Sequence, residues 1–96
     1  MNETTTIKLR KPITAHGEDI QELKLREPTG EDIEKCGYPL AIGEGKAYPI
    51  AESVSKLIAR LAAIPPSSVK QLAVADYQAA MGVVLGFFGS GETDAD

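Results

Sequence analysis

The chain has few of the residues on which catalytic, disulfide-bonded and membrane-spanning proteins depend. It contains one cysteine, Cys36, and one histidine, His16, among 96 residues. A single cysteine excludes a disulfide within the chain and is typical of a reducing cytoplasm. No apolar run approaches the roughly 18 residues of a transmembrane helix, and the N-terminal MNETTTIKLR has no apolar core of signal-peptide length. The sequence therefore predicts a soluble intracellular protein.

Positive charge is also scarce. Lys and Arg number 10 against 14 Asp and Glu, which gives a net charge of −4. A surface that neutralises phosphates needs clustered Lys and Arg, so we expect no nucleic-acid partner. The length suits one domain with a modest core, and the apolar fraction of 43% is ordinary for a globular chain. We expect a single domain over residues 1–89, followed by a disordered acidic tail over residues 90–96.

Two stretches of the chain share one pattern, IKLRKP at residues 7–12 and LKLREP at residues 23–28. A repeat architecture would need at least about three copies, and no third copy follows. In both stretches apolar residues alternate with charged ones, as in a strand with one buried face. Gly17 lies between them and suits a turn. We therefore expect an antiparallel hairpin of residues 4–11 and 19–27, each strand closed by a proline. The buried face is expected to hold Ile7, Leu9, Leu23 and Leu25, and the outer face the cations, Arg10 and Arg26 among them.

The rest of the chain predicts helices. Thr29 can cap a helix start, and Asp32 three residues later can return the bond, as in a capping box. Apolar residues recur at helical spacing over residues 50–64, and two prolines end that pattern. A short helix is expected through residues 66–72 and a last helix over residues 74–88. The predicted fold class is α+β, with an N-terminal two-stranded antiparallel hairpin followed by three to four helices.

The segment 37–49 is expected to form an extended loop. It carries three glycines and two prolines and shows no period. It also carries large side chains that a purely solvated linker would not need, so we expect it to dock on another surface. These are Tyr38, Leu40, Ile42 and Tyr48, of which Leu40 and Tyr48 are candidate partner-binding residues.

The last predicted helix is apolar on nearly all sides, and so short a chain can hardly surround one of its own helices. Its large residues suit an adaptable binding surface. The candidate partner-binding residues here are Tyr77, Met81, Val84, Phe87 and Phe88. A second stripe of small residues either admits the preceding helix or the hairpin at close range, or meets another chain. This stripe consists of Ala75, Ala79, Gly82 and Gly86, the candidates for self-association.

Nothing in the sequence predicts catalysis, a cofactor or a metal. His16 lies in the predicted turn, where a general base would have neither a partner nor a pocket. Cys36 is interpreted as a small buried hydrophobe. The acidic residues between 27 and 34 suit a helix start and match no calcium loop. GEGK at residues 43–46 lacks the glycine spacing and the hydroxyl residue of a phosphate loop. We expect no enzymatic activity.

The order of these features resembles the tail assembly chaperone family of Mu-like and P2-like long-tailed bacteriophages and their prophage relatives. The shared features are the two strands with their glycine turn, a Pro-Thr-x-x-Asp helix start at residues 28–32 and an apolar helix ending in Ile-Pro at residues 64–65. Ala-Asp-Tyr at residues 75–77 and Phe-Phe at residues 87–88 complete them. Together they cover roughly residues 6–89. The chain departs from the family in its glycine-rich middle and at Ala73, where a capping Asp or Ser is more usual.

The resemblance implies a non-enzymatic protein of the bacterial host cytoplasm that is absent from the mature virion. It implies binding to the tape measure protein during tail morphogenesis, contact with the tail tube protein, and a frameshift-extended form of the chain as a further partner. Separately from the resemblance, the apolar last helix predicts either a homo-oligomer or an exposed binding patch around Tyr77, Met81 and Phe88. The alternative is a small prophage or host regulatory domain that inhibits another protein. A gene between those of the tail tube and the tape measure would favour the chaperone.

Overall fold

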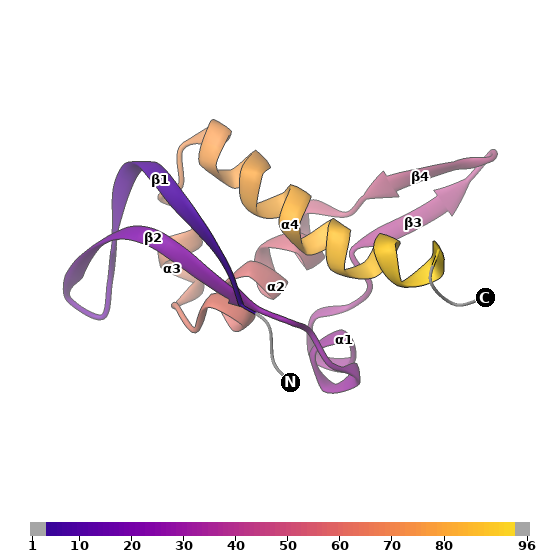
Figure 1. The fold of residues 1–96 in the computed structure, drawn as a ribbon, viewed down its shortest axis with the longest axis horizontal. Coiled ribbons are helices and arrows are strands. Elements are labelled where there is room, and N and C mark those ends of the chain that lie inside the picture. Colours follow the sequence, from indigo (N-terminus) through magenta and orange to yellow (C-terminus); the bar gives the residue numbers. More distant parts are fainter. Residues whose placement is uncertain (1–3, 94–96) are drawn as a thin grey trace.

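The computed structural model describes residues 4–93, which form two β-hairpins and four helices (Figure 1). The predicted α+β class and N-terminal hairpin are confirmed, while the second hairpin was not expected. The elements are β1 (Thr4–Ala15), β2 (Glu18–Arg26), α1 (Gly30–Cys36), β3 (Leu40–Gly43), β4 (Lys46–Pro49), α2 (Ala51–Ala62), α3 (Pro66–Val69) and α4 (Val74–Thr93).

The first hairpin pairs β1 with β2 antiparallel. His16 and Gly17 form its turn, both with positive φ (54° and 79°), as the favoured two-residue hairpin turn requires. The predicted end of the first strand at residue 11 was wrong, because β1 continues to Ala15. The register shifts between Lys8 and Ile13, so that residues 9–12 of β1 lie opposite one residue of β2. Pro12 falls within this break, where its missing N–H costs the ladder nothing.

Side chains from the C-terminal part of the chain form hydrogen bonds with the backbone of β1, both within this break and after it. The carboxylate of Asp76 in α4 accepts hydrogen bonds from the backbone N–H groups of Arg10, at 3.0 Å, and Lys11, at 3.1 Å. Gln71 accepts the N–H of Thr14 at 2.8 Å. These bonds satisfy backbone groups that β2 leaves unpaired and hold α4 beside β1. They also cover an edge that could otherwise pair with another chain.

The core lies between the apolar face of the first hairpin and the helices. Leu23 and Leu25 are buried, and Ile7 and Leu9 pack partly buried against the same cluster, which confirms the predicted face. Of the remaining core, α2 contributes more residues than any other element, and its apolar spacing predicted that it would bury one side. Its buried apolar residues are Val54, Leu57, Ile58, Ala59 and Leu61.

Residues 40–49 form a hairpin, so the expectation of an extended loop over the whole segment 37–49 was wrong. β3 pairs with β4 antiparallel, and Glu44 and Gly45 form the turn with φ of 53° and 76°. Each strand has only four residues, too few for an alternating pattern to stand out from the surrounding glycines and prolines. Pro49 accordingly ends β4 and does not occupy the first position of α2. The hairpin projects from the body of the molecule near the C-terminal half of α4 (Figure 1).

The last helix extends further than predicted. α4 runs to Thr93, beyond the expected end at Phe88. Residues 90–93 of the predicted acidic tail are therefore helical backbone. Residues 94–96 lie outside the described part of the chain, where the disordered tail stays a prediction.

Candidate partner-binding surface

α4 buries one narrow line of side chains against the core. The described side chains on its other faces remain partly or fully exposed. Asp76, Ala80 and Val84 are 2%, 0% and 0% exposed, and their spacing of four places them on one face. Val84, one of the candidate partner-binding residues, is thus part of the core of the free chain. The other candidates on this helix flank the line half-buried and pack against the core. They are Tyr77, Met81, Phe87 and Phe88.

The stripe of small residues on α4 faces outward. Ala75, Ala79, Gly82 and Gly86 are all exposed. A Cβ atom built on Gly82 would meet no atom within 4 Å apart from the adjoining backbone of α4 itself. Among the residues described, neither the preceding helix nor the hairpin covers this stripe, so that alternative was wrong. Self-association through the stripe stays a prediction.

Most of the large exposed hydrophobic side chains in the described chain lie in the second hairpin or just before it. Tyr38, Ile42 and Tyr48 are 47%, 84% and 44% exposed, and only Val74 joins them among the large exposed hydrophobic residues of the described chain. Ile42 lies on the face of the hairpin shared with Leu40. Tyr48 lies on the other face, where its ring is 3.6 Å from a Cβ built on Gly43. Apolar side chains are thus exposed on both faces of a narrow projection, which is typical of a binding site.

The structure brings this hairpin together with the end of α4. The ring of Tyr38 meets that of Phe88 edge to face, with centroids 5.2 Å apart and planes at 80°. Two regions that the sequence singled out separately, the 37–49 segment and the last helix, are therefore continuous in space. We name this the hairpin–α4 surface and define it by Tyr38, Leu40, Ile42, Tyr48 and Phe88.

A few contacts anchor the hairpin at its base. The N–H of Ile50, after β4, donates to the carbonyl of Pro39, before β3, at 2.8 Å. Pro39 is itself fully buried. Gly37 has φ of 88°, and a Cβ there would lie 2.9 Å from Oγ of Ser53. A side chain larger than hydrogen would therefore push the start of the hairpin away from α2.

A buried carboxylate joins the elements around this base. Asp32 of α1 is 1% exposed and accepts two hydrogen bonds from the Arg26 guanidinium, at 2.8 and 2.9 Å. Its Oδ2 accepts the N–H of Thr29 at 2.7 Å, the predicted capping-box bond, and Arg60 of α2 donates to Oδ1. The Arg26 hydrogen bonds hold the pKa of this carboxyl well below its usual range, against the opposing effect of burial.

This ion-pair cluster was missed in the sequence. Asp32 was interpreted as a capping residue and as helix-start charge, without an ion pair, and Arg26 was placed on the outer face. The only signal was local, because the cap lies three residues from Asp32, whereas Arg60 lies 28 residues away. The outward orientation of Arg26 is therefore corrected, since its guanidinium turns back onto Asp32.

The two residues with catalytic side-chain types lie in structural positions. The Nε2 atom of His16 is 3.2 Å from the carbonyl oxygen of Ala63, which ties the first hairpin turn to the end of α2. Cys36 is buried, and this burial raises the pKa of its thiol. Within residues 4–93 no group of three or more His, Cys, Asp or Glu side chains could hold a metal ion. No helix in the same range has the length and apolar character needed to cross a membrane.

Comparison with protein families decides the identity. A family model described as phage tail assembly chaperone proteins, E, or 41 or 14, matches residues 6–89 of the chain. The chain belongs to the phage tail assembly chaperone family. The match covers all of the described elements except the first two residues of β1 and the end of α4. Neither the curated proteins nor the solved structures contained a match to the chaperone.

Family membership confirms the resemblance drawn from the order of motifs. This family consists of assembly chaperones, so the chaperone is not an enzyme, and it is expected to act by binding tail proteins. Its function then has to be sought in the surfaces that it presents. Among these, the hairpin–α4 surface exposes the most large apolar side chains.

Proposed function

We propose that this chaperone binds the tape measure protein during tail assembly and that the hairpin–α4 surface makes the contact. The observation that carries the proposal is the gathering of Tyr38, Ile42 and Tyr48 on one projecting hairpin of a tail assembly chaperone. A tape measure protein presents a long apolar helical surface, which a chaperone must cover to keep it soluble. Exposed aromatic and aliphatic side chains are the chemistry that such a surface requires.

The shape of the hairpin suits a partner with many successive segments. Two strands alone are marginally stable, and β3 and β4 pair only with each other. The hairpin can therefore adjust its angle to the body at low cost, while the Pro39 and Ile50 bond keeps its base in place. Covering a side chain as exposed as Ile42 would contribute about 1.5–3 kcal/mol to binding.

The family also implies further binding partners and a place in the cell where the chaperone acts. The chaperone acts in the bacterial host cytoplasm, contacts tail tube subunits while it holds the tape measure, and leaves before the virion is complete. The exposed small stripe of α4 serves a second copy of the chain or a frameshift-extended form of it. A regulatory domain that inhibits another protein has no specific observation in its favour.

A charge placed on the hairpin tests the contact. Ile42→Asp should abolish co-purification with a tape measure fragment from the same phage and leave the fold intact, because Ile42 is 84% exposed. Thr6→Asp adds the same carboxylate to an exposed position of β1 and should bind as wild type does. Met81→Lys is a weaker probe, because Met81 packs against the core and its loss would also destabilise the chain. Equal binding by the Ile42 and Thr6 variants would exclude the hairpin as the contact.

A further inference from the structure

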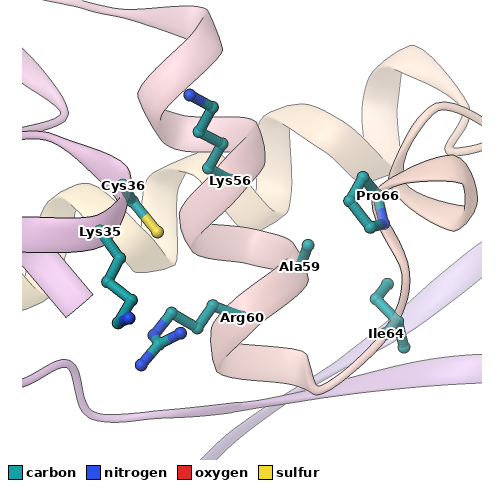
Figure 2. Close-up of a pocket in the computed structure, with 7 residues that line it drawn as sticks. All are labelled: Lys35, Cys36, Lys56, Ala59, Arg60, Ile64 and Pro66. Atoms are coloured by element: carbon teal, nitrogen blue, oxygen red, sulfur yellow. The ribbon is translucent and has the colours of Figure 1, made fainter. Parts of the chain in front are cut away.

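A second surface, separate from the exposed hairpin, runs across the polar side of α2. One hollow of about 320 Å³ lies between α1 and α2, with Cys36 and Ala59 on its wall (Figure 2). A second, of about 400 Å³, shares Lys56 and Pro66 with the first. A third, of about 330 Å³, shares Ser55, Val69 and Lys70 with the second. We call these three adjoining hollows the α2 groove.

The groove follows one face of α2. Glu52, Ser55, Lys56 and Ala59 line it, at the helical spacing of three and four residues. Glu52, Ser55 and Lys56 lie on the side of α2 that faces away from the first hairpin, whereas Ala59 is buried at the base of the groove, where α1 packs against α2. Figure 2 shows side chains of α1 on one side of the helix and Pro66 on the other. Most of the remaining lining is apolar, from Cys36, Ile64, Val69, Leu72 and Val74.

The charged side chains along the groove are mostly positive. Four of the 10 Lys and Arg residues of an otherwise acidic chain line it, whereas Glu52 is the one carboxylate among the lining residues. The four cations are Lys35, Lys56, Arg60 and Lys70. These four cations create a region of positive potential on a protein whose net charge is −4, and this region attracts carboxylates.

Much of this positive charge is available to a partner. Arg60 is committed to Asp32 and also lies 3.5 Å from Glu31. Lys56 lies 3.4 Å from Glu52, but both side chains are exposed, and such pairs exchange readily with other partners. Lys35 and Lys70 form no ion pair with the side chains that the structure describes. The groove thus offers an apolar floor beside ammonium groups that lack a strong internal partner.

We propose that the α2 groove receives an amphipathic helix of the tape measure protein whose apolar face is bordered by Asp and Glu. This inference rests on the proposed function and adds where, and by what chemistry, a second contact is made. The three adjoining hollows have apolar lining that can receive the apolar side chains of such a helix, and the lysines can pair with the bordering carboxylates. The hairpin would supply apolar contact area, and the groove would select segments by charge.

Charge reversal with a matched control tests the inference. The groove variant is Lys56→Glu with Lys70→Glu. The control is Lys24→Glu with Lys11→Glu, on the first hairpin. Each pair changes the net charge equally, and each contains one lysine in a weak exposed ion pair, Lys56 with Glu52 and Lys24 with Glu22. The affinity of each purified variant for a tape measure fragment with an acidic amphipathic helix is measured by calorimetry at about 50 and 500 mM salt.

The groove variant should bind at least about tenfold more weakly than wild type at low salt, and its affinity should respond less to salt. The control should stay within about threefold. Carbodiimide should couple Lys35, Lys56 or Lys70 to carboxylates of the fragment. Groove and control variants of equal affinity, or coupling confined to other lysines, would overturn the inference while leaving tape measure binding in place. Failure of the wild-type chain to bind would instead overturn the proposed function, and the groove assignment with it.

Discussion

Replacing Asp32 by asparagine should destabilise the chaperone far more than its place in a short surface helix suggests. The change keeps the shape of the side chain but removes the charge that Arg26 and Arg60 share. Removing one partner of a buried ion pair costs about 3–5 kcal/mol when the other charge is left without solvent. Here the two arginine side chains are 40% and 33% exposed and can regain water, so we expect about 2–3 kcal/mol.

Urea and thermal unfolding measure this loss. For a domain of this size the melting temperature should fall by about 8–24 °C. Glu34→Gln is the matched control, since it makes the same carboxylate-to-amide change on an exposed residue of the same helix. Its effect should stay within about 0.5 kcal/mol. Equal losses from the two variants would refute the view that Asp32 joins α1, β2 and α2.

The pH dependence follows from the lowered pKa of Asp32. The folded state holds this carboxyl ionised more strongly than the unfolded chain does, so its contribution is complete above the unfolded pKa, near 3.9, and is lost as pH falls. The difference in unfolding free energy between wild type and Asp32→Asn should shrink by about 1.3 kcal/mol between pH 6 and pH 3. A difference that stays constant over this range would contradict the ion-pair assignment.

Three further predictions concern the hairpin, its link to α4 and the small stripe. Leu25→Asp should unfold the protein, because Leu25 is fully buried, whereas Arg26→Ala should cost about 1–2 kcal/mol, as circular dichroism during urea unfolding would show. Asp76→Ala should cost about 2–3 kcal/mol and speed amide exchange in residues 10–11, and unchanged exchange there would remove its bridging role. Gly82→Ala should stabilise monomeric α4 by about 0.5–1 kcal/mol, because the site is open, and should weaken any dimer formed through the stripe. Light scattering across a dilution series would reveal a dimer that the change leaves intact.

What the sequence could predict depended on the range of the interactions involved. The first hairpin and α2 were identified because each repeats a local period over many residues and buries one face. The Thr29 cap was identified because its partner lies three residues away. These features need no knowledge of what packs against them.

The missed features depend on contacts between distant segments. Arg26 alternates outward in the strand, and only the folded position of α1 brings Asp32 to it. The second hairpin has strands of four residues and leaves Ile42 exposed, so no burial pattern marks it. α4 is apolar on nearly all sides, which left open the choice of its buried face. The buried face of α4 is the one that carries Asp76, Ala80 and Val84. Asp76 on this face accepts hydrogen bonds from backbone N–H groups of β1, which fixes its orientation.

The two proposed surfaces are likewise formed by contacts between distant segments. The contact between Tyr38 and Phe88 joins residues that the sequence marked separately, so the candidates were found but not their grouping. The α2 groove lies over residues that helical spacing assigns to solvent. Its cations come from α1, α2 and the end of α3, and nothing in the local sequence indicates that they line adjoining hollows.

The central claim is that this chaperone binds and solubilises the tape measure protein. The direct measurement is the soluble fraction of that protein when it is produced in bacteria with and without the chaperone. We predict that the tape measure protein aggregates alone, remains soluble with wild-type chaperone in a complex that survives gel filtration, and aggregates again with Ile42→Asp. A tape measure protein that stays insoluble beside the wild-type chaperone, with no complex in the soluble fraction, would contradict this account.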